Sequence, residues 1–479
     1  MKTTFPLSIL YLTALGAVSA GPIADDTAAV CNYLSASYPD HMSWDPESHA
    51  GAADANQYNF AVQHYWNSAN ADNRPLCVFF PSTSAAVSDA VKQLNQHPRA
   101  KFALKSGGHN FNKGISSVDG GVLLSFNENL SSVTRSADGE SFEVGPGARW
   151  GDAYKETSKT NQIVVGGRLA NIGVGGFVLG GGLSYYSAQY GLSCDNVLNF
   201  EVVLPDGTIA NANSTSNPDL FWALKGGGNR FAIVTKFTLQ AHPAGIDGQI
   251  WGGVRIYSAD DRHALFSGLS EFVRDYPDAK AAVIPTFDIG LPNAAVSQPM
   301  LFFFYDGPTP PEDAFSAVGK VKPLLDLTST QTYPSLTSMA GGAAIYGIST
   351  TARVNTFPNM EPKLTAQLLE SHWNSYTEHT KNDSSKNLDI QFSTFTPQPI
   401  STRVARATQA RGGNALGLDP DNGDRIWVEN DLIWVNPVCD EACPSNLRNL
   451  TDEIDNDFHA RFAGQKPTNY KSGDVDFIS

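Results

Sequence analysis

Three glycine-rich stretches in the first half of the chain constrain its fold more than any other feature. They are Ser106-Gly107-Gly108-His109, the run from Gly166 to Gly182, and Gly226-Gly227-Gly228. Glycine has no Cβ atom and adopts positive φ readily, so its backbone can approach a ligand closely and turn N–H groups toward an anion. The middle stretch carries isoleucine, valine, leucine and phenylalanine between its glycines, whereas a flexible linker would carry serine and charge. The pattern therefore predicts a bound ligand with a pyrophosphate and a large planar part.

The first glycine stretch is expected at the end of a strand. Residues 78–80 and 101–104 are interpreted as strands, and Ser82-Thr83-Ser84 caps a helix between them whose apolar residues recur with the helical period. This β-α-β unit places the loop at the carboxyl edge of its sheet. Further strands are expected at 121–126, 142–145, 163–165 and 232–239, short helices at 150–157 and 219–225, and a hairpin over 200–211 that turns at Pro205-Asp206-Gly207.

The second half of the chain has longer elements. We expect strands at 250–257, 282–289, 301–305, 388–394 and 425–435, and helices at 261–276, 312–321, 362–378 and 445–462. Strands in succession with helices grouped to one side favour an α+β domain with an antiparallel sheet. At 479 residues the chain also exceeds one ordinary core, which favours two domains.

Composition and missing motifs exclude several function classes. The net charge is −15 and no basic cluster occurs, which excludes a nucleic-acid partner and gives no support to membrane-surface binding. The strict dinucleotide fingerprint is absent, because Val178 and Phe231 stand where its third glycine would be. A phosphate loop, a serine-hydrolase elbow and an H-E-x-x-H motif are also missing, and no cysteine and histidine spacing resembles a zinc site.

The N-terminus predicts secretion. Lys2, the apolar run 5–18 and the small residues up to Ala20 are typical of a signal peptide over 1–20, and a buried first helix is the disfavoured alternative. Secretion permits disulfides, and the expected pairs are Cys31–Cys77 and Cys439–Cys443, which leaves Cys194 as a buried thiol. Acceptor sequons for N-glycans, which also occur by chance, stand at Asn129, Asn213, Asn382 and Asn449.

Four motifs, taken in order, resemble one protein family. They are Pro81-Ser82-Thr83, Ser106-Gly107-Gly108-His109, Ile172-Gly173-Val174-Gly175-Gly176 with Gly180-Gly181-Gly182, and the run from Asp219 to Gly228 with Ile233-Val234-Thr235. The set resembles the berberine-bridge-enzyme-like branch of the vanillyl-alcohol-oxidase flavoproteins, and Gly412-Gly413-Asn414 extends a weaker likeness beyond it. The resemblance implies an α+β fold with an N-terminal segment over 21–73, a PCMH-type FAD-binding domain over 74–242, a substrate domain over 243–479 and the active site between the two domains.

The resemblance also implies which residues surround the cofactor. Those expected to bind FAD are Ser106, Gly107, Gly108, His109, Asn110, Ser116, Ile172, Gly173, Gly175, Gly176, Gly182, Gly228 and Ile233. His109 stands where such proteins attach the 8α-methyl carbon of the flavin covalently, and an ordinary turn histidine is the alternative. Leu169 replaces a cysteine that forms a second bond in some relatives, so we expect a single bond through His109. Phe177 replaces a common histidine, and Arg230 has no assigned role.

The sequence leaves the general base unassigned. Oxidation of an alcohol or C–H bond by a flavin needs a base that takes a proton. Asp419 and Glu429 lie on or near the strand region that faces the flavin in relatives, although each is also explained as a solvated or turn carboxylate. Relatives continue through a strand and a helix that contact the flavin region. This sequence reaches Ser479 about where that strand would begin, so both elements are expected to be missing from it, either because the sequence is truncated or because the protein manages without them.

These observations lead to one expected function and two alternatives. We expect a secreted FAD-linked oxidoreductase that oxidises an alcohol or C–H bond of a small specialised metabolite, with molecular oxygen reoxidising the flavin. A carbohydrate oxidase is the alternative enzyme, since aromatic residues in the expected substrate strands, such as Phe302 and Trp427, suit a sugar equally well. A flavin-binding protein that binds or cyclises a ligand without net redox turnover is the alternative of another class.

Overall fold

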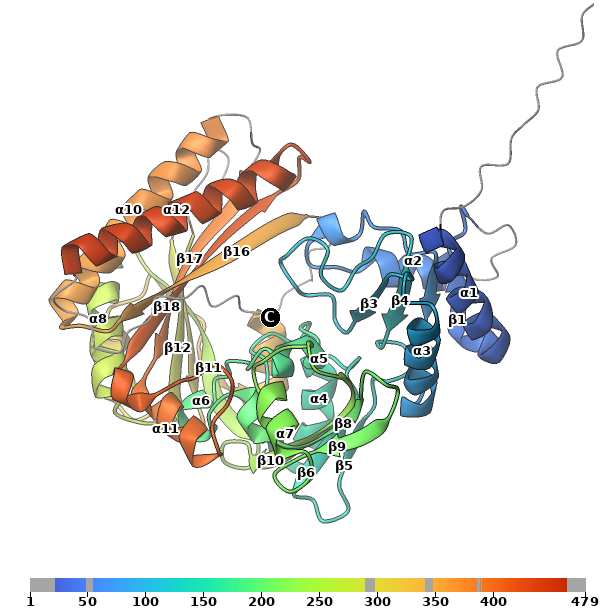
Figure 1. The fold of residues 1–479 in the computed structure, drawn as a ribbon. Helices are drawn as coiled ribbons and strands as arrows, with labels where there is room; N and C mark the ends of the chain where they lie inside the picture. The colour runs from blue at the N-terminus through green and yellow to red at the C-terminus, as the bar shows by residue number, and fades with distance from the viewer. Residues whose placement is uncertain are drawn as a thin grey trace, which may run out of the picture.

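The computed structural model describes residues 22–48, 55–288, 298–340, 348–385, 388 and 390–462, which form three sheets (Figure 1). The expected signal peptide and the residues from 463 onward lie outside this part of the chain. The first sheet has the strand order β1-β2-β4-β3 and is flanked by three helices. Its elements are α1 (Pro22–Ser37), β1 (Met42–Trp44), α2 (Ala55–Gln63), β2 (Cys77–Phe79), α3 (Ser84–Gln96), β3 (Phe102–Lys105) and β4 (Val122–Ser125).

The expected β-α-β unit is present in this sheet. Thr83 caps α3, since its side-chain oxygen accepts a hydrogen bond from the Ala86 N–H at 3.1 Å. Strands β2 and β3 each pair in parallel with β4, which lies between them. The first glycine loop therefore leaves the sheet at the carboxyl end of β3, as the sequence predicts.

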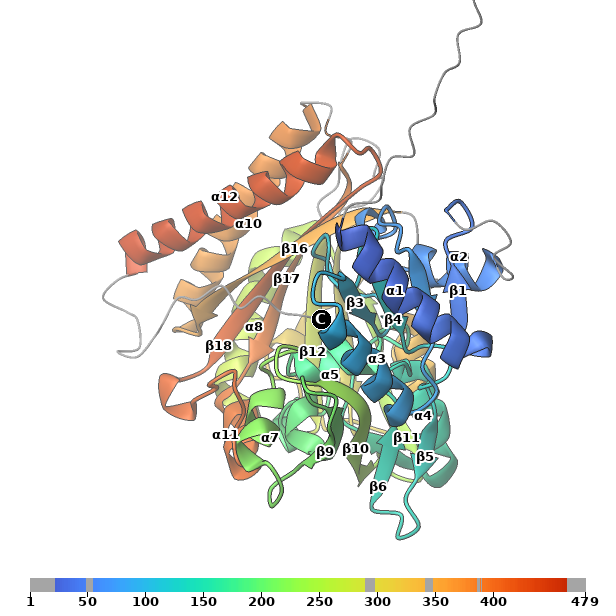
Figure 2. The same ribbon diagram turned by 45° about the vertical axis from the view of Figure 1, so that its right-hand side comes forward.

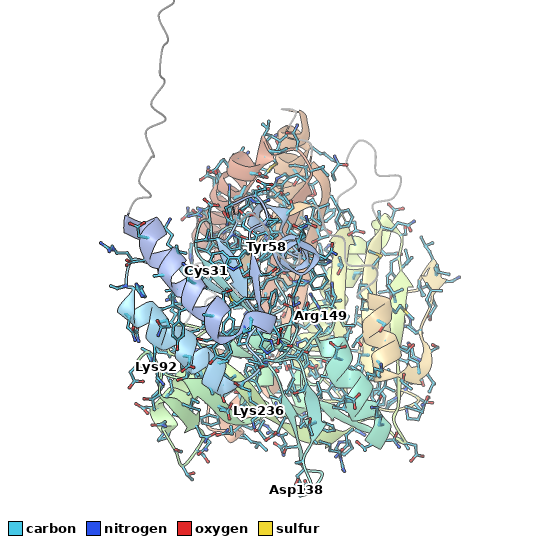
Figure 3. The ribbon with its side chains drawn as sticks, turned by 90° about the vertical axis from the view of Figure 1, so that its right-hand side faces the viewer. Cys31, Tyr58, Lys92, Asp138, Arg149 and Lys236 are labelled. Carbon is cyan, nitrogen blue, oxygen red and sulfur yellow. A yellow bond between two sulfur atoms is a disulfide. The ribbon has the colours of Figure 1, made fainter. Side chains whose placement is uncertain are left out.

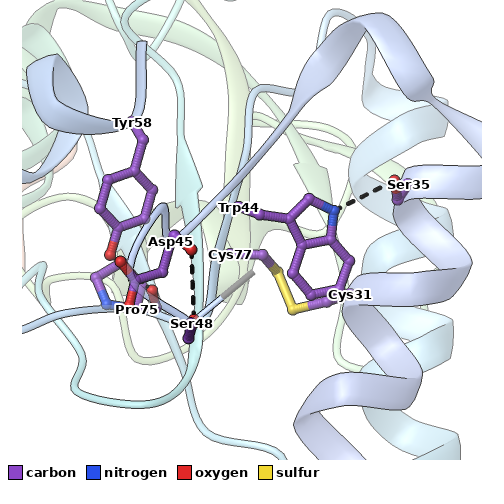
Figure 4. Close-up of a disulfide and its surroundings, with 8 residues drawn as sticks. All are labelled: Cys31, Ser35, Trp44, Asp45, Ser48, Tyr58, Pro75 and Cys77. Atoms are coloured by element: carbon purple, nitrogen blue, oxygen red, sulfur yellow. Dashed lines mark hydrogen bonds between the residues drawn. A yellow bond between two sulfur atoms is a disulfide. The ribbon is translucent and has the colours of Figure 1, made fainter. Parts of the chain in front are cut away.

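A disulfide fastens α1 to this sheet. Cys31 on α1 is bonded to Cys77 on β2, with 6.1 Å between the two Cα atoms, which confirms the first expected pair (Figure 4). Trp44 lies beside the disulfide and donates from its indole N–H to the Ser35 hydroxyl at 3.4 Å (Figure 4). Helix α1 lies against α3 on the outside of the molecule (Figure 3). The second expected pair, Cys439–Cys443, is also bonded.

The second sheet is built around its long central strand. Strand β10 pairs with β6, β7 and β8, and the main order of the sheet is β5-β6-β10-β8-β9. Strands β8 and β9 form the expected hairpin, whose turn contains Gly207 at φ +85°. The elements are β5 (Val133–Arg135), β6 (Ser141–Val144), α4 (Trp150–Thr157), β7 (Gln162–Val164), α5 (Val174–Leu179), α6 (Ser187–Tyr190), β8 (Val197–Val203), β9 (Ile209–Ala212), α7 (Pro218–Leu224) and β10 (Ile233–Pro243).

The third sheet is large and antiparallel throughout, with the order β14-β11-β13-β12-β17-β18-β16 and β15 paired to β11. Helices α8, α10 and α12 cover one face, and the opposite face is turned toward the glycine-rich loops (Figures 1 and 2). The α+β fold with an antiparallel sheet is thus confirmed. Its elements are β11 (Gln249–Ile256), α8 (Arg262–Asp275), β12 (Ala281–Asp288), β13 (Pro299–Tyr305), β14 (Leu325–Asp326), β15 (Ser329–Thr332), α9 (Tyr333–Ala340), β16 (Ser349–Pro358), α10 (Pro362–Ser385), β17 (Ile390–Ile400), α11 (Thr402–Ala410), β18 (Arg425–Trp434) and α12 (Cys439–Phe462).

One expected helix is wrong. Residues 312–321 form turns and a short 3-10 segment over Val318–Lys320, and Ser316 adopts φ +48°. This segment packs on α8 where Gly268 has no side chain: a Cβ atom there would lie 2.8 Å from the backbone of Val318. Tertiary packing thus overrides the helical pattern. The sequence interpretation also missed β16, α9 and α11.

Cys194 is buried and unpaired, as expected. Burial raises the pKa of its thiol, and the neighbouring Asp195 raises it further. From the sequence no basic residue is expected near this thiol, but Lys225 lies close enough to oppose the shift, although burial dominates. Among the described residues, none of the helices has both the length and the apolar composition that crossing a bilayer requires.

Candidate active site

Two adjoining cavities lie where the glycine-rich loops meet the third sheet. Each has a volume of about 820 Å³. The first cavity lies between the glycine loops and β10, and the second is bounded by residues 168–183 and by strands β16, β17 and β18. His109 and Phe177 line both cavities and form the wall between them. Concave spaces lined by glycine backbone, apolar side chains and a few polar groups are where cofactors and substrates usually bind.

The structure brings the expected cofactor residues together around these cavities. Ile172 and Gly182 line the second cavity, and His109 borders both. The others line the first cavity: Ser106, Gly107, Gly108, Asn110, Ser116, Gly173, Gly175, Gly176, Gly228 and Ile233. Glu429 lines the second cavity. Asp419 lines neither, because it caps the 3-10 turn Pro420–Asn422 by accepting from the Asp421 N–H at 3.0 Å.

Two glycine loops that are far apart in sequence touch through their backbones. A Cβ atom on Gly107 would lie 2.5 Å from the Gly173 nitrogen, and a Cβ atom on Gly173 would lie 2.4 Å from the Gly107 nitrogen. Beside this contact the Ser106 hydroxyl donates to the Pro146 carbonyl at 2.6 Å and accepts from the Gly175 N–H at 3.3 Å. The contact explains why neither position can carry a side chain.

His109 is positioned by an aromatic neighbour and not by a hydrogen bond. Its ring stacks on Trp66 with 4.5 Å between the ring centroids and an angle of 15° between the planes. Both imidazole nitrogens are buried and form no hydrogen bond with the described residues. Burial lowers the pKa of His109 to about 4, so the ring is neutral at physiological pH. A neutral, unpaired imidazole at a cavity wall is available to a ligand.

Strand β18 carries two acidic side chains on one face, and one of them, Glu429, lines the second cavity. Trp427, Glu429 and Asp431 alternate along the strand and therefore share one face. The Gln398 amide donates to Glu429 at 2.9 Å, and the Thr394 hydroxyl donates to Asp431 at 2.7 Å. Burial raises the pKa of both carboxyls, and the charge of Glu429 raises that of Asp431 further. Glu429 is thereby a carboxyl whose anion, once formed, is a stronger base than a solvated glutamate.

The opposite face of β18 is held by a buried amide. Asn430 is fully buried, and its side-chain oxygen accepts a hydrogen bond from the Nε2–H of His372 at 2.9 Å. Its amide nitrogen donates to the Arg353 carbonyl at 3.3 Å and to the Asn355 side-chain oxygen at 3.2 Å. These contacts join β18 to the neighbouring strand β16 and to helix α10.

The sequence interpretation missed several residues that line or support the site. Trp66 stacks on His109, Arg168 and Gln398 line the second cavity, and Asp431 shares the face of Glu429. The alternation of Trp427, Glu429 and Asp431 along an expected strand could have revealed Asp431. For Trp66 and Arg168 the sequence gives no signal, because their partners are distant in the chain.

The comparisons with known proteins agree with this geometry. A family model described as an FAD binding domain matches residues 75–213. An uncharacterised FAD-linked oxidoreductase of Arthroderma benhamiae is 35% identical over 394 residues, which cover 82% of this chain and 76% of the relative. The chain belongs to the FAD-linked oxidoreductase family. Its motifs resemble those of the berberine-bridge-enzyme-like members, and the family membership makes the chain an FAD-dependent oxidoreductase.

Two further known proteins are similar to this oxidoreductase, one in sequence and one in structure. The FAD-dependent monooxygenase drtC of Aspergillus calidoustus is 31% identical over 401 residues, covering 82% of this chain and 73% of the relative. The crystal structure of a carbohydrate oxidase from Microdochium nivale matches with a TM-score of 0.70 and 19% identity, covering 90% of this chain and 88% of that chain. At that identity the structure establishes a shared fold.

The residues of the first cavity fit FAD. The backbone contact at Gly107 and Gly173 lets main-chain N–H groups converge without side chains, as a pyrophosphate requires. Ser116 adopts φ +53°, and its buried hydroxyl forms no hydrogen bond with the described residues. Together with the unpaired imidazole of His109, these groups are available to a phosphate-bearing cofactor at the cavity wall.

Substitution by alanine is expected to lower the stability of the protein at one glycine of this cavity and not at another. Gly107→Ala places a Cβ atom against the Gly173 backbone and should lower the free energy of unfolding by roughly 1–3 kcal/mol. At Gly176, inside α5, a Cβ atom meets nothing within 4 Å, so Gly176→Ala should not destabilise the flavin-free protein. It should still lower the flavin content, because Gly176 lines the cavity. Urea unfolding and flavin absorbance measure the two effects, and equal unfolding midpoints for the two variants would contradict the backbone contact.

Proposed function

We propose that this oxidoreductase is secreted, carries FAD covalently on His109 alone, and oxidises an alcohol or C–H bond of a small specialised metabolite with molecular oxygen as the final acceptor. The observation that carries the proposal is the position of His109, which is neutral, unpaired and shared by both cavities. A covalent bond at this position would fix the reactive ring at the boundary between cofactor and substrate. When bound, FAD supplies the two-electron acceptor for substrate oxidation.

The cofactor would be held mainly by the first cavity. We assign its phosphates to the loop Ser106–Asn110 and Ser116, and its contacts with apolar walls to residues such as Ile233. Leu169 occupies the second cavity where some relatives carry a cysteine, so His109 remains the single expected attachment point. The neutral imidazole suits this role, since a protonated ring could not act as a nucleophile.

The second cavity would hold the substrate, with Glu429 as general base. Glu429 lines this cavity together with Trp427, while His109 lies on its other side. A raised pKa suits a base that must take a proton near neutral pH. Gln398 orients the carboxylate through the hydrogen bond to its second oxygen. Of the two carboxylates considered from the sequence, Glu429 is the one that the cavity geometry supports.

A carbohydrate oxidase is the second candidate function. Trp427 offers an aromatic surface in the second cavity that could stack on a sugar ring, and the structural likeness to a carbohydrate oxidase agrees with such a use of the fold. Peroxide formation with free sugars or oligosaccharides would favour this candidate. Peroxide formation with phenolic or alicyclic alcohols, and none with sugars, would favour the first.

Secretion is supported by the disulfides and by the exposure of several sequons. Cys31–Cys77 and Cys439–Cys443 both require an oxidising compartment to form reliably. Asn382 and Asn449 are exposed, whereas the side-chain nitrogens of Asn129 and Asn213 donate to the Phe80 carbonyl at 2.8 Å and to the Asn199 side chain at 2.9 Å. We therefore propose glycans at Asn382 and Asn449 and none at Asn129 or Asn213. We also propose that the FAD-binding domain spans residues 74–242 and that the substrate domain spans residues 243–479.

Acid precipitation tests the attachment of the flavin. The parent protein should retain its yellow colour in the acid-precipitated pellet, whereas His109→Ala should release all of its flavin into the supernatant. His263→Ala serves as a matched control, because His263 is 63% exposed on the distant helix α8. Complete release of flavin from the parent protein would overturn the covalent bond while leaving the FAD site itself in place.

A further inference from the structure

The second cavity is lined by a cation that forms no hydrogen bond or ion pair with the residues that the structure describes. Arg168 lines this cavity and also a smaller adjoining cavity of about 380 Å³. Among the described residues, no hydrogen bond or ion pair is formed by its guanidinium group. Burial lowers the pKa of Arg168, while electrostatic interactions with Tyr185, Glu429 and Tyr333 act in the opposite direction. The side chain is half-buried, and a guanidinium that loses part of its water without gaining a hydrogen-bond partner is costly unless a ligand supplies the anion.

The backbone around Arg168 is firmly held. Gly166 and Gly167 pack against the indole of Trp150, where added Cβ atoms would lie 2.2 and 2.6 Å from its ring. The Tyr154 hydroxyl donates to the Gly167 carbonyl at 2.6 Å. On the other side of Arg168, the Ala170 carbonyl accepts from the Gly151 N–H at 2.8 Å. The cation is therefore presented to the cavities by a fixed segment, which is what a recognition residue requires.

A second donor lies beside it. Tyr185 lines the smaller cavity with Arg168, and its ring stacks on Phe304 with 5.1 Å between centroids. Its hydroxyl is buried and forms no hydrogen bond with the described residues. Burial raises the pKa of Tyr185 to about 12, so the hydroxyl remains protonated and can donate. A guanidinium and an unpaired hydroxyl facing one space form a site for an oxyanion.

We propose that Arg168 and Tyr185 form an oxyanion subsite, so that this oxidoreductase selects substrates bearing a carboxylate or an ionised enol or phenol. The inference rests on the proposed function, in which the second cavity holds the substrate. The acidic oxygen would bind between Arg168 and Tyr185, and the carbon to be oxidised would lie nearer to His109 and Glu429. The planar fork of arginine suits a carboxylate or an enolate with two neighbouring oxygens.

The groups that face Arg168 allow two substitutions with opposite expected effects on the affinity for an anion. Glu429 comes from β18 and Tyr185 and Tyr333 come from the segments packed against Arg168, while Asp431 lies farther along the β18 face. Removing the cation should weaken the binding of an anion. Removing the carboxylate, as in Glu429→Gln, should strengthen it. A structural role for Arg168 would not produce this opposition of signs.

Calorimetric titration of the flavin-loaded protein tests the proposal. The probes are benzoate and its neutral isostere benzamide for the carboxylate arm, and 4-hydroxycoumarin and neutral coumarin for the enol arm. At least one anion should bind about tenfold or more tightly than its neutral isostere. This preference should be lost in Arg168→Gln, reduced in Tyr185→Phe and largely kept in Arg168→Lys. The exposed controls Arg448→Gln and Tyr33→Phe should keep it in full.

Several outcomes would overturn the subsite. Equal binding of anions and neutral isosteres by the parent protein would do so, as would a preference that survives in both Arg168→Gln and Tyr185→Phe. If Arg168→Gln does not fold, Tyr185→Phe and Glu429→Gln decide the matter, because each keeps the shape of its side chain. Failure of the proposed function is seen separately, since acid release of the flavin and peroxide formation do not depend on these probes.

Discussion

The Cys31→Ala, Cys77→Ala double variant is expected to unfold with a free energy about 4 kcal/mol below that of the parent protein. The bond closes a loop of 46 residues, and the restriction that it places on the unfolded chain grows with loop length. Both sulfur atoms belong to the apolar core between α1 and the first sheet. Without the bond, α1 is held to the sheet by packing alone. Urea unfolding of protein produced under oxidising conditions measures the loss.

The second disulfide provides a matched comparison. Cys439 and Cys443 are four positions apart, and the same dependence on loop length gives a loss of only about 2 kcal/mol for Cys439→Ala, Cys443→Ala. Loss of the Cys31–Cys77 bond should therefore lower the free energy of unfolding more than loss of Cys439–Cys443. Spectroscopic probes placed near α1 should report this unfolding first. Equal shifts for the two double variants would show that loop closure does not explain the stabilisation.

Glu429→Gln is expected to lower the rate of substrate oxidation about 10²- to 10⁴-fold, the usual contribution of a positioned general base. Glutamine keeps the shape of the side chain and can still accept the hydrogen bond from Gln398, so the cavity should keep its form. It cannot take a proton. The rate of flavin bleaching under anaerobic conditions, with a substrate identified from peroxide formation, measures the chemical step without the oxygen reaction.

The pH dependence gives an independent signature of the same residue. Because burial raises the pKa of Glu429, the parent rate should rise with pH as this carboxyl ionises, at a higher pH than for a solvated glutamate. Asp431→Asn should leave that rise close to its parent position, since the charge of Glu429 raises the pKa of Asp431 and keeps that carboxyl protonated while Glu429 ionises. Glu441→Gln is the control, because Glu441 is 92% exposed on α12. If Glu429→Gln reacts as fast as Glu441→Gln, another group is the base.

Local pattern was sufficient to predict most of the first half of the fold. The β-α-β unit and the hairpin at Gly207 follow from turn residues and helical spacing that act over short distances. The cofactor residues could be named because three glycine stretches appear in a fixed order. That they line two connected cavities is a result of the structure.

The rest depends on contacts that sequence does not display. The segment 312–321 has a helical pattern, but its environment is set by Gly268 on α8. Trp66 reaches His109 from a region without a recognisable motif, and Arg168 stands in a glycine-rich run whose pattern says nothing about a cation facing a cavity. The choice between Asp419 and Glu429 likewise required knowing which one is used to cap a turn.

The buried amide of Asn430 has a consequence for the chemistry on the other side of its strand. A shift of β18 by one residue would exchange the faces of Asn430 and Glu429, since successive side chains point in opposite directions. The amide would lose His372 and Asn355, and a carboxyl group would be driven among the helices. Asn430 therefore fixes the register of β18. The placement of Glu429 at the second cavity is thus decided during strand pairing, by a residue on the opposite face of the strand.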